Sequence, residues 1–317
     1  MPTHDGRPAE YVVTPDESGQ KLLQFLQRRL HLPQSLLHRW VRTGQVRCNG
    51  GRCKPFTRVA CGDTVRLPPF AMKMAAQGDT VQTMAPPDML PPLPPLVGEA
   101  DGILAFFKPA GLPTHDGTGH TDSLAGRLAA HYARADFAPT PAHRLDKNTT
   151  GLLLVATSYT ALRQIQECMQ QGLLAKEYLA WVHGRWPWPE ERLLCHMLRK
   201  ESRQGLERMH TVEAGGKEAR CLVRPLRTHG QSSLLHVRLL TGRTHQIRAQ
   251  LAQEGHAVLG DSKYGTASGG SRRMYLHSLR VSLPDGRSFA CLPDWPVPRA
   301  LEALPPPLFL PKDKGLM

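Results

Sequence analysis

The chain has 317 residues, of which 40% are hydrophobic and 21% charged, which is typical of a globular protein with about two domains. Lysine and arginine number 40 against 27 aspartates and glutamates, and the resulting net charge of +13 favours a polyanionic partner, nucleic acid ahead of a membrane surface. No apolar run is long enough to span a bilayer, and the odd number of scattered cysteines argues against a disulfide framework.

The N-terminal residues and the cysteines bear on the cellular compartment. Residues 1–11 lack the apolar core of a signal peptide, and scattered thiols are typical of a reducing compartment, so we expect a cytoplasmic protein. Cys48, Cys53 and Cys61 lie close together without forming a Cys-x-x-Cys pair, and we expect no metal site. The sequence leaves the oligomeric state open, with a monomer as the default expectation.

The N-terminal part of the chain has the pattern of a small α+β domain. A short strand at 11–13 precedes two helical patterns, at 19–30 and 33–42, in which apolar residues recur with the period of a helix. A hairpin signal at 45–50 and a closing strand at 62–67 follow. This order predicts two helices packed on a small sheet.

A proline-rich stretch separates this part from the rest of the chain. Residues 85–95 cannot continue a helix or lie in a central strand, because proline lacks the backbone N–H that both require, and we expect them to be extended. We therefore divide the chain into an N-terminal domain at 1–70, a linker at 71–98 and a C-terminal domain at 99–317.

In the C-terminal domain, strands outnumber helices and do not alternate regularly with them. Helices are expected at 123–134, 159–171 and 244–254, the last two capped by Ser158 and Thr244. Strands are expected at 102–107, 152–156, 176–184, 233–240, 275–283 and 287–292. This pattern predicts an α+β fold with a mostly antiparallel sheet, and it argues against a doubly wound fold.

The most informative segment is the sequence His-Arg-Leu-Asp-Lys-Asn-Thr-Thr-Gly at 143–151. It holds Asp146 in a polar turn just ahead of the apolar run 152–156, and a buried strand there would anchor the carboxylate on a rigid element. The segment is similar to the catalytic signature of the RluA-type pseudouridine synthases, which isomerise uridine to pseudouridine in folded RNA. Thr150 departs from the serine that is usual in the family but keeps the hydroxyl.

The resemblance extends over nearly the whole chain. In the C-terminal domain it also includes the segments 108–111, 176–178, 242–248 and 260–265. The segments 36–50 and 62–65 resemble the S-four-like RNA-binding domain, which is named after a protein of the small ribosomal subunit. The resemblance therefore implies a pseudouridine synthase catalytic domain with a mixed, mostly antiparallel sheet, preceded by a small RNA-binding α+β domain.

Three residues are candidates for catalysis. Asp146 is implied to be essential, either by attacking the sugar carbon or by assisting proton removal at C2′; an isolated aspartate would more often cap a turn. By resemblance the guanidinium of Arg243 pairs with Asp146, whereas Arg248 fits a structural ion pair or a phosphate contact better. The ring of Tyr178 is expected to stack on the uracil and its hydroxyl to serve the proton transfer at C5, although a tyrosine in an apolar strand is more often a core residue. Ile247 and Leu276 are candidates for the apolar walls around the base.

Other residues are candidates for RNA binding. Arg144 is well placed to fill the space that an extruded uridine leaves, or to hold the adjacent phosphate. His143 is equally well explained as a structural residue. In the N-terminal domain a basic group lies on the second helix and the loops after it, where contacts with phosphates would position the protein without reading sequence. Its members are Arg39, Arg42, Arg47, Arg52, Lys54 and Arg58.

The sequence thus predicts a pseudouridine synthase that acts on ribosomal RNA of the large subunit. The isomerisation is redox-neutral and involves no net hydrolysis, so we expect no cofactor. A pseudouridine synthase for transfer RNA is one alternative. A non-catalytic RNA-binding or ribosome-assembly factor is another, but it predicts the loss of Asp146, Arg243 or Tyr178, and all three are present.

Overall fold

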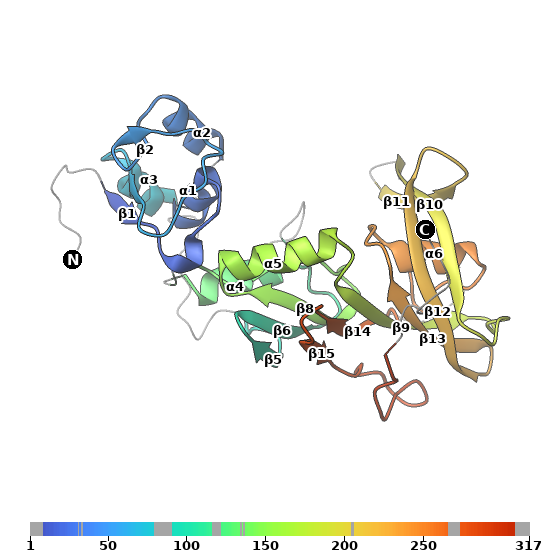
Figure 1. The fold of residues 1–317 in the computed structure, drawn as a ribbon. Coiled ribbons are helices and arrows are strands. Elements are labelled where there is room, and N and C mark those ends of the chain that lie inside the picture. The colour runs from blue at the N-terminus through green and yellow to red at the C-terminus, as the bar shows by residue number, and fades with distance from the viewer. Residues whose placement is uncertain are drawn as a thin grey trace.

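The computed structural model describes residues 9–78, 91–115, 122–265 and 273–307, apart from 31, 33, 134, 136, 204 and 205. Most of the segment 1–11 and part of the proline-rich stretch 85–95 lie outside the described residues. A small N-terminal body and a larger body built on one long sheet make up the molecule (Figure 1). No helix in the described part of the chain has the length and apolar character needed to cross a membrane.

The small body contains a four-stranded antiparallel sheet in the order β1-β4-β2-β3. The two predicted helices are confirmed, and Phe25, Leu37 and Trp40 from them are fully buried in its core. The strands are β1 (Glu10–Val12), β2 (Arg47–Cys48), β3 (Gly51–Arg52) and β4 (Thr64–Arg66). The helices are the 3-10 turn η1 (Pro15–Glu17), α1 (Leu22–Leu30), α2 (Gln34–Arg42) and α3 (Ala71–Gly78).

The segment assigned to the linker contains regular structure at both ends. Helix α3 begins at Ala71, whose side chain is fully buried in the same core as α1, so this helix packs on the small body. At the other end β5 (Leu96–Ala100) pairs with β6 (Ile103–Lys108) in the long sheet. The sequence lacks strong apolar periodicity in both places, and each element is stabilised by packing on its neighbour.

The large body is built on one mixed sheet in the order β11-β10-β12-β13-β9-β14-β8-β6-β5, with β15 on β14 and β7 on β8. Among the described strands only β14 and β8 pair in parallel, so the predicted α+β fold with a mostly antiparallel sheet is confirmed. The further strands are β7 (Thr140–Pro141), β8 (Thr150–Ala156), β9 (Ala175–His183), β10 (Arg192–Arg203), β11 (Leu206–Val212), β12 (Lys217–His229), β13 (Ser232–Leu239), β14 (Leu276–Ser282) and β15 (Ser288–Ala290). The helices are α4 (Leu124–His131), α5 (Tyr159–Gln170) and α6 (Gln246–Gln253).

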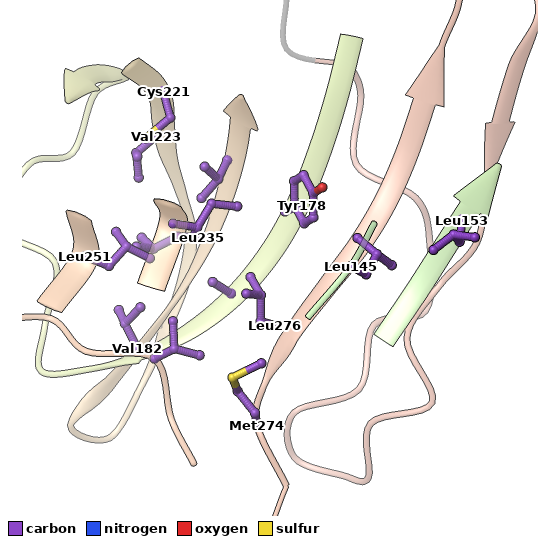
Figure 2. Packing of buried hydrophobic residues seen from close by; sticks show 14 of the residues in the cluster. Leu145, Leu153, Tyr178, Val182, Cys221, Val223, Leu235, Leu251, Met274 and Leu276 are labelled. Carbon is purple, nitrogen blue, oxygen red and sulfur yellow. The ribbon is translucent and has the colours of Figure 1, made fainter. Parts of the chain in front are cut away.

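Strand β9 has a different core on each of its faces. Tyr178, Ala180 and Val182 belong to the cluster that also contains residues of α6, whereas Leu179 and Trp181 belong to a second cluster. This alternation follows from the two-residue repeat of a strand. Figure 2 shows Tyr178 in the first cluster with Leu145 and Leu276, so the tyrosine ring faces the side of the sheet on which the loop before β8 lies.

Two features near the loop 142–149 depend on unusual backbone conformations. Gly151 has φ +104°, and a Cβ there would lie 2.3 Å from the carbonyl oxygen of Ser278, so only glycine allows β8 and β14 to approach this closely. His245 precedes α6 with φ 51°, and it is this residue, not Thr244, that occupies the N-cap position. The predicted cap at Thr244 is therefore wrong, because the chain turns through a left-handed residue after it. By contrast, Ser158 caps α5 as predicted, accepting a hydrogen bond from the Ala161 N–H.

Candidate active site

The loop between β7 and β8 and the start of α6 enclose a pocket of about 240 Å³. Tyr178 reaches it from β9 and Leu276 from β14. The pocket brings together residues that are far apart in sequence and that were predicted separately. Asp146, Arg144, His143, Tyr178, Arg243, Ile247 and Leu276 all line it.

The loop that carries Asp146 is fastened on both sides of this residue. On one side, the Leu145 N–H donates to the Thr114 hydroxyl, which in turn donates to the Leu145 carbonyl, each at 3.1 Å. On the other side, the Lys147 carbonyl accepts from the Gly111 N–H at 2.9 Å and from Lys108 Nζ at 3.0 Å. These bonds hold the backbone of the loop 142–149 against the segment that follows β6, which keeps the carboxylate of Asp146 in a fixed place.

Lys108 is the centre of this fastening. Its side chain is fully buried, and its Nζ also donates to the carbonyls of Pro109 and Leu112 at 2.9 Å each. Three donated bonds use all three hydrogens of an ammonium group. Burial lowers the pKa of Lys108 to about 7, while the negative charge of Asp146 works in the opposite direction. The segment 108–111 was notable in the sequence only for its family resemblance. In the structure it holds the loop of Asp146 in place.

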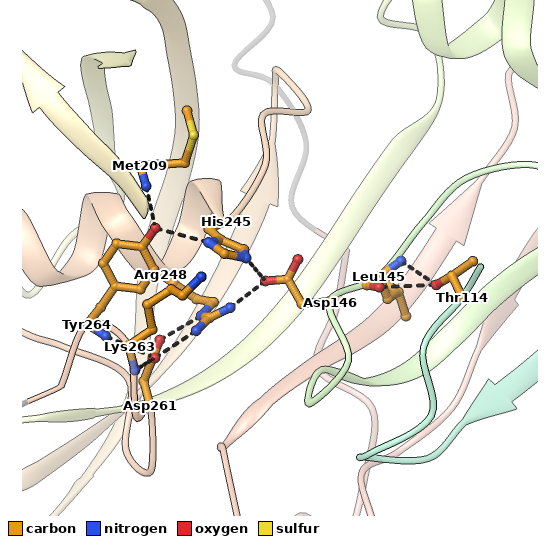
Figure 3. Close-up of polar contacts among 9 residues, drawn as sticks. All are labelled: Thr114, Leu145, Asp146, Met209, His245, Arg248, Asp261, Lys263 and Tyr264. Atoms are coloured by element: carbon orange, nitrogen blue, oxygen red, sulfur yellow. Dashed lines mark hydrogen bonds and ion pairs between the residues drawn. The ribbon is translucent and has the colours of Figure 1, made fainter. Parts of the chain in front are cut away.

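Asp146 forms its ion pair with Arg248. Nη1 of Arg248 donates to Asp146 Oδ2 at 2.7 Å, while Nε and Nη2 donate to the two oxygens of Asp261 at 2.7 and 2.8 Å (Figure 3). Burial disfavours the charge on Arg248, but the bonds and the negative charge of Asp261, followed by those of Asp146, raise its pKa. Arg248 is therefore a permanent cation between two carboxylates. The side chain of Asp146 remains 18% exposed, so it is open to a substrate.

Arg243 does not make the ion pair that the sequence predicted for it. Its side chain is exposed, and Nε donates to the carbonyl oxygen of Glu218 on β12 at 2.9 Å. The physical reason is that Arg243 lies before the left-handed turn at His245, whereas Arg248 lies in the first turn of α6 and faces the loop. Arg243 still lines the pocket.

His245 and Tyr264 extend the polar network around Asp146. The Tyr264 hydroxyl accepts from the Met209 N–H at 2.8 Å, so its own hydrogen is available to His245 Nδ1, which lies 3.0 Å away (Figure 3). This arrangement leaves the imidazole hydrogen on Nε2, 3.7 Å from Asp146 Oδ2. Burial lowers the pKa of His245 despite the charge of Asp146, so a neutral imidazole faces the carboxylate at neutral pH.

Tyr178 and two apolar side chains form the less polar part of the pocket. Ile247 and Leu276 are almost fully buried and line it from α6 and β14. Burial raises the pKa of Tyr178, and the nearby charge of Asp146 adds to this effect, so the hydroxyl keeps its proton at neutral pH. An aromatic ring beside apolar walls suits a flat heterocycle.

The two residues before Leu145, His143 and Arg144, have different environments. Arg144 is exposed at the rim of the pocket. His143 is buried, and its Nε2 accepts from the Leu154 N–H at 3.1 Å, while burial lowers its pKa to about 4. This geometry favours the structural interpretation of His143, since its acceptor nitrogen already satisfies a backbone N–H of β8.

The predicted basic group lies on the small body. Arg39 and Arg42 are exposed on α2. Arg52, Lys54 and Arg58 are exposed, and Arg47 is half-buried on β2. None of these residues lines the pocket at Asp146. Any part that they take in RNA binding is therefore separate from the chemistry.

Sequence reasoning did not assign a role to several residues of the site. Asp261, His245 and Tyr264 lie within segments that carried the resemblance, yet no local pattern indicates that they meet at Asp146. Lys176, which lines the pocket, is a further case; burial lowers its pKa. One signal was available in the sequence, the aspartate at the second position of the Gly-Asp-Ser-Lys-Tyr-Gly segment, which is Asp261. A carboxylate that is buried in the fold requires a cationic partner.

Comparisons with known proteins identify the family of this chain. The family model described as RNA pseudouridylate synthase matches residues 102–253. The chain is 34% identical over 284 residues to the ribosomal large subunit pseudouridine synthase C of Yersinia pestis, covering 86% of this chain and 87% of that protein. The protein of the same name from Haemophilus influenzae is 32% identical over 277 residues, covering 85% of each.

A solved structure also resembles this chain. The human RNA pseudouridylate synthase domain containing 1 matches with a TM-score of 0.52 and 25% sequence identity, over 63% of this chain and 82% of that one. The likeness in fold thus accompanies the likeness in sequence. Since the identity to the Yersinia pestis protein exceeds 30% over most of both chains, this chain belongs to the RluA-type family of RNA pseudouridine synthases.

Proposed function

We propose that this RNA pseudouridine synthase isomerises uridines in large-subunit ribosomal RNA, in the cytoplasm and as a monomer. Its relatives from Yersinia pestis and Haemophilus influenzae are named as synthases for the large ribosomal subunit, which supports this class of RNA. The net charge of +13 supports a large polyanionic substrate. All seven cysteines are free, which supports a reducing compartment.

The reaction exchanges one bond of the ribose for another. The bond from C1′ to N1 of the uracil breaks, and a bond from C1′ to C5 forms. One proton leaves C5, and N1 gains one, so the product is an isomer and atoms and electrons balance. The enzyme must therefore stabilise an electron-poor sugar carbon and hold a detached base while it turns.

The partly exposed carboxylate of Asp146 is the observation that carries the proposal. It lies in the pocket with one oxygen on the guanidinium of Arg248. A fixed neighbouring cation favours the ionised carboxylate, which is the form required for attack at C1′ or for removal of a proton at C2′. We assign to Asp146 the reaction at the sugar and to Arg248 the positioning of the carboxylate.

Tyr178 has a separate role in this proposal. Its ring packs beside the apolar side chains of Ile247 and Leu276, where a uracil would stack. Because its pKa is raised by burial, the hydroxyl acts as a hydrogen-bond donor to the base and is poorly suited to act as a base itself.

Arg144 and Arg243 are assigned to RNA at the rim of the pocket. Both side chains are exposed, and both line the pocket opening with a guanidinium group. A uridine in structured RNA must be extruded before C1′ can be reached, which costs roughly a few kcal/mol. Arg144 filling the vacated space and Arg243 holding a phosphate would each offset part of this cost.

Primer extension after carbodiimide treatment tests the proposal, because pseudouridine retains the bulky adduct and stops the polymerase. Large-subunit RNA is incubated with the wild type or with Asp146→Asn. We expect stops with the wild type alone and a rate at least ~10³-fold lower for the variant. Asp146→Asn is expected to melt close to the wild type, since Arg248 keeps both of its bonds to Asp261.

The outcomes separate the substrate from the chemistry. Stops with neither protein on large-subunit RNA, followed by stops on transfer RNA, would replace the proposed substrate and keep the enzyme. Equal stops with the wild type and with Asp146→Asn would remove Asp146 from the reaction.

A further inference from the structure

A second hollow lies between the small body and the catalytic domain. It has a volume of about 400 Å³ and runs between α1 and α5. Gln24 and Arg28 line it from α1, and Tyr159 and Gln166 line it from α5. We call this hollow the interdomain groove. It adjoins the active-site pocket, since Arg144 and His143 line both.

Direct contacts hold the two sides of the interdomain groove together. The guanidinium carbon of Arg28 lies 4.4 Å from the centre of the Phe137 ring, a cation–π contact between the two bodies. The 3-10 turn η1 also contacts α5, and the ring of Tyr159 lies near Gly19, since a Cβ built on this glycine would be 3.8 Å from the ring. Figure 1 shows the small body beside the start of α5. The groove therefore has two walls that are in contact with each other.

The chemistry of the interdomain groove suits a nucleic acid strand. None of the described residues that line it is acidic, and two of them, Arg28 and Arg144, are permanent cations. Nη1 of Arg28 is buried and has no hydrogen-bond partner among the described residues, so no carboxylate of the chain neutralises this guanidinium at the nitrogen. Guanidinium groups suit phosphates, an aromatic ring such as that of Tyr159 suits stacking, and amides suit base edges.

We propose that the interdomain groove holds the single-stranded RNA segment next to the target uridine. The inference rests on the proposed function, because an extruded uridine in the pocket requires that its neighbours leave past the rim. Arg144 stands at the junction, so a strand that passes it enters the groove directly. The small body then takes part in substrate positioning through α1, at a place distinct from the basic group on α2 and the loops after it.

A pair of charge changes tests the interdomain groove. Gln24 on α1 and Gln166 on α5 are exposed and both line the groove, and Gln24→Glu/Gln166→Glu would place two carboxylates beside the RNA phosphates. Gln27→Glu/Gln170→Glu is the matched control: the same helices, the same change of charge and the same exposure, but outside the groove. Rates are measured as tritium release from large-subunit RNA transcribed with uridine labelled at C5.

We expect the groove pair to raise KM by at least roughly tenfold, with a smaller effect on kcat, and the control pair to stay within about twofold of the wild type. Equal KM values for the two double variants would overturn the proposed role of the interdomain groove and would leave the synthase activity unaffected. If the wild type released no tritium from this RNA, the proposed substrate itself would be wrong. Both double variants should have the melting temperature of the wild type, because all four substituted side chains are exposed.

A measurement on the unaltered protein gives a second test. A 4-thiouridine placed next to the modified uridine is expected to cross-link, on irradiation, to the α5 peptide that contains Tyr159. Cross-links confined to peptides outside α1, α5 and Arg144 would overturn the proposal even if the groove pair had a raised KM.

Discussion

Arg248 is the residue on which both carboxylates of the site converge. It donates two hydrogen bonds to Asp261 and a third to Asp146, and its side chain is 10% exposed. The bonds use the fork geometry of a guanidinium group, which a lysine ammonium cannot reproduce. Asp261 in turn accepts from the backbone N–H groups of Lys263 and Tyr264, so the position of Arg248 is fixed by the chain after it.

Replacing each of the two arginines by lysine separates their roles. Arg248→Lys is expected to lower kcat/KM by at least ~10²-fold, because Asp146 loses its positioning bond. It should also lower the free energy of unfolding by about 1–3 kcal/mol, since the buried Asp261 loses a bidentate partner. Arg243→Lys changes an exposed side chain and should alter stability by no more than about 0.5 kcal/mol.

Steady-state kinetics and thermal melting of both variants check this difference. A larger loss of kcat/KM for Arg243→Lys than for Arg248→Lys would mean that Arg243 moves onto Asp146 when RNA binds, as the sequence predicted. Comparable melting temperatures for Arg248→Lys and the wild type would contradict the structural part of the argument.

At the scale of single residues, the sequence located the carboxylate but not its cation. Asp146 was predictable because the motif that identifies it is contiguous in sequence, from 143 to 151. The choice between Arg243 and Arg248 depends on the direction of α6, which is set by one left-handed residue, His245. No local pattern indicates a left-handed histidine, since its conformation is stabilised by contacts with Tyr264 and with the loop.

At the scale of elements, two buried neutral histidines hold β8 in place: His277 joins it to β14, and His143 joins it to the loop that precedes it. His277 accepts from the Thr150 hydroxyl at Nδ1, 2.8 Å away, and donates from Nε2 to the Cys291 carbonyl, 2.9 Å away. His143 accepts from the Leu154 N–H. Burial lowers the pKa of each imidazole to about 4, so protonation would remove an acceptor and place a charge in the core.

The two histidines predict a loss of stability in mild acid. In the unfolded chain an imidazole takes up its proton near pH 6.5, whereas in the folded protein His143 and His277 do so only near pH 4. Between these values the unfolded state binds more protons, so the free energy of unfolding falls as the pH falls. Two such groups give a slope of up to about 2.7 kcal/mol per pH unit in the middle of this range.

Urea denaturation at several pH values between 7 and 4 measures this slope. His143→Gln retains a side-chain oxygen that can accept from the Leu154 N–H and removes one of the two titrations, so it should reduce the histidine contribution by about half. A slope unchanged in this variant would show that the acid sensitivity arises elsewhere.

Besides α3 and β5, the elements that the sequence failed to predict include the long strands β10, β11 and β12. Leu194 and Leu198 are the fully buried apolar residues of β10, spaced four apart along a strand whose other described positions are largely polar. This spacing lacks the alternation that identifies a strand with one buried face. The strands are stabilised instead by pairing with one another and by contact of β10 and β11 with α6.

At the scale of the whole molecule, the site lies within a single domain, whereas the surface available to RNA extends over both. The small body lies beside α5, and the hairpin of β10 and β11 stands at the far end of the long sheet (Figure 1). The sequence predicted two domains but gave no relative placement, because the contact between Arg28 and Phe137 and the contact of η1 with α5 follow no periodic pattern. The position of the small body relative to the large one is therefore visible only in the three-dimensional structure.

This arrangement predicts that the exposed arginines of α2 contribute affinity only for a long RNA. Arg39→Glu/Arg42→Glu removes two exposed cations that do not line the pocket. Binding to large-subunit RNA should weaken, and the slope of log affinity against log salt should become less steep by about two, since two phosphates would no longer be neutralised by an arginine. On a short stem-loop that contains only the target uridine, the variant and the wild type should bind alike, because such an RNA does not reach α2. Binding titrations over a salt series with both RNAs measure these slopes, and an equal decrease in affinity for the two RNAs would contradict a separate role of the small body in RNA binding.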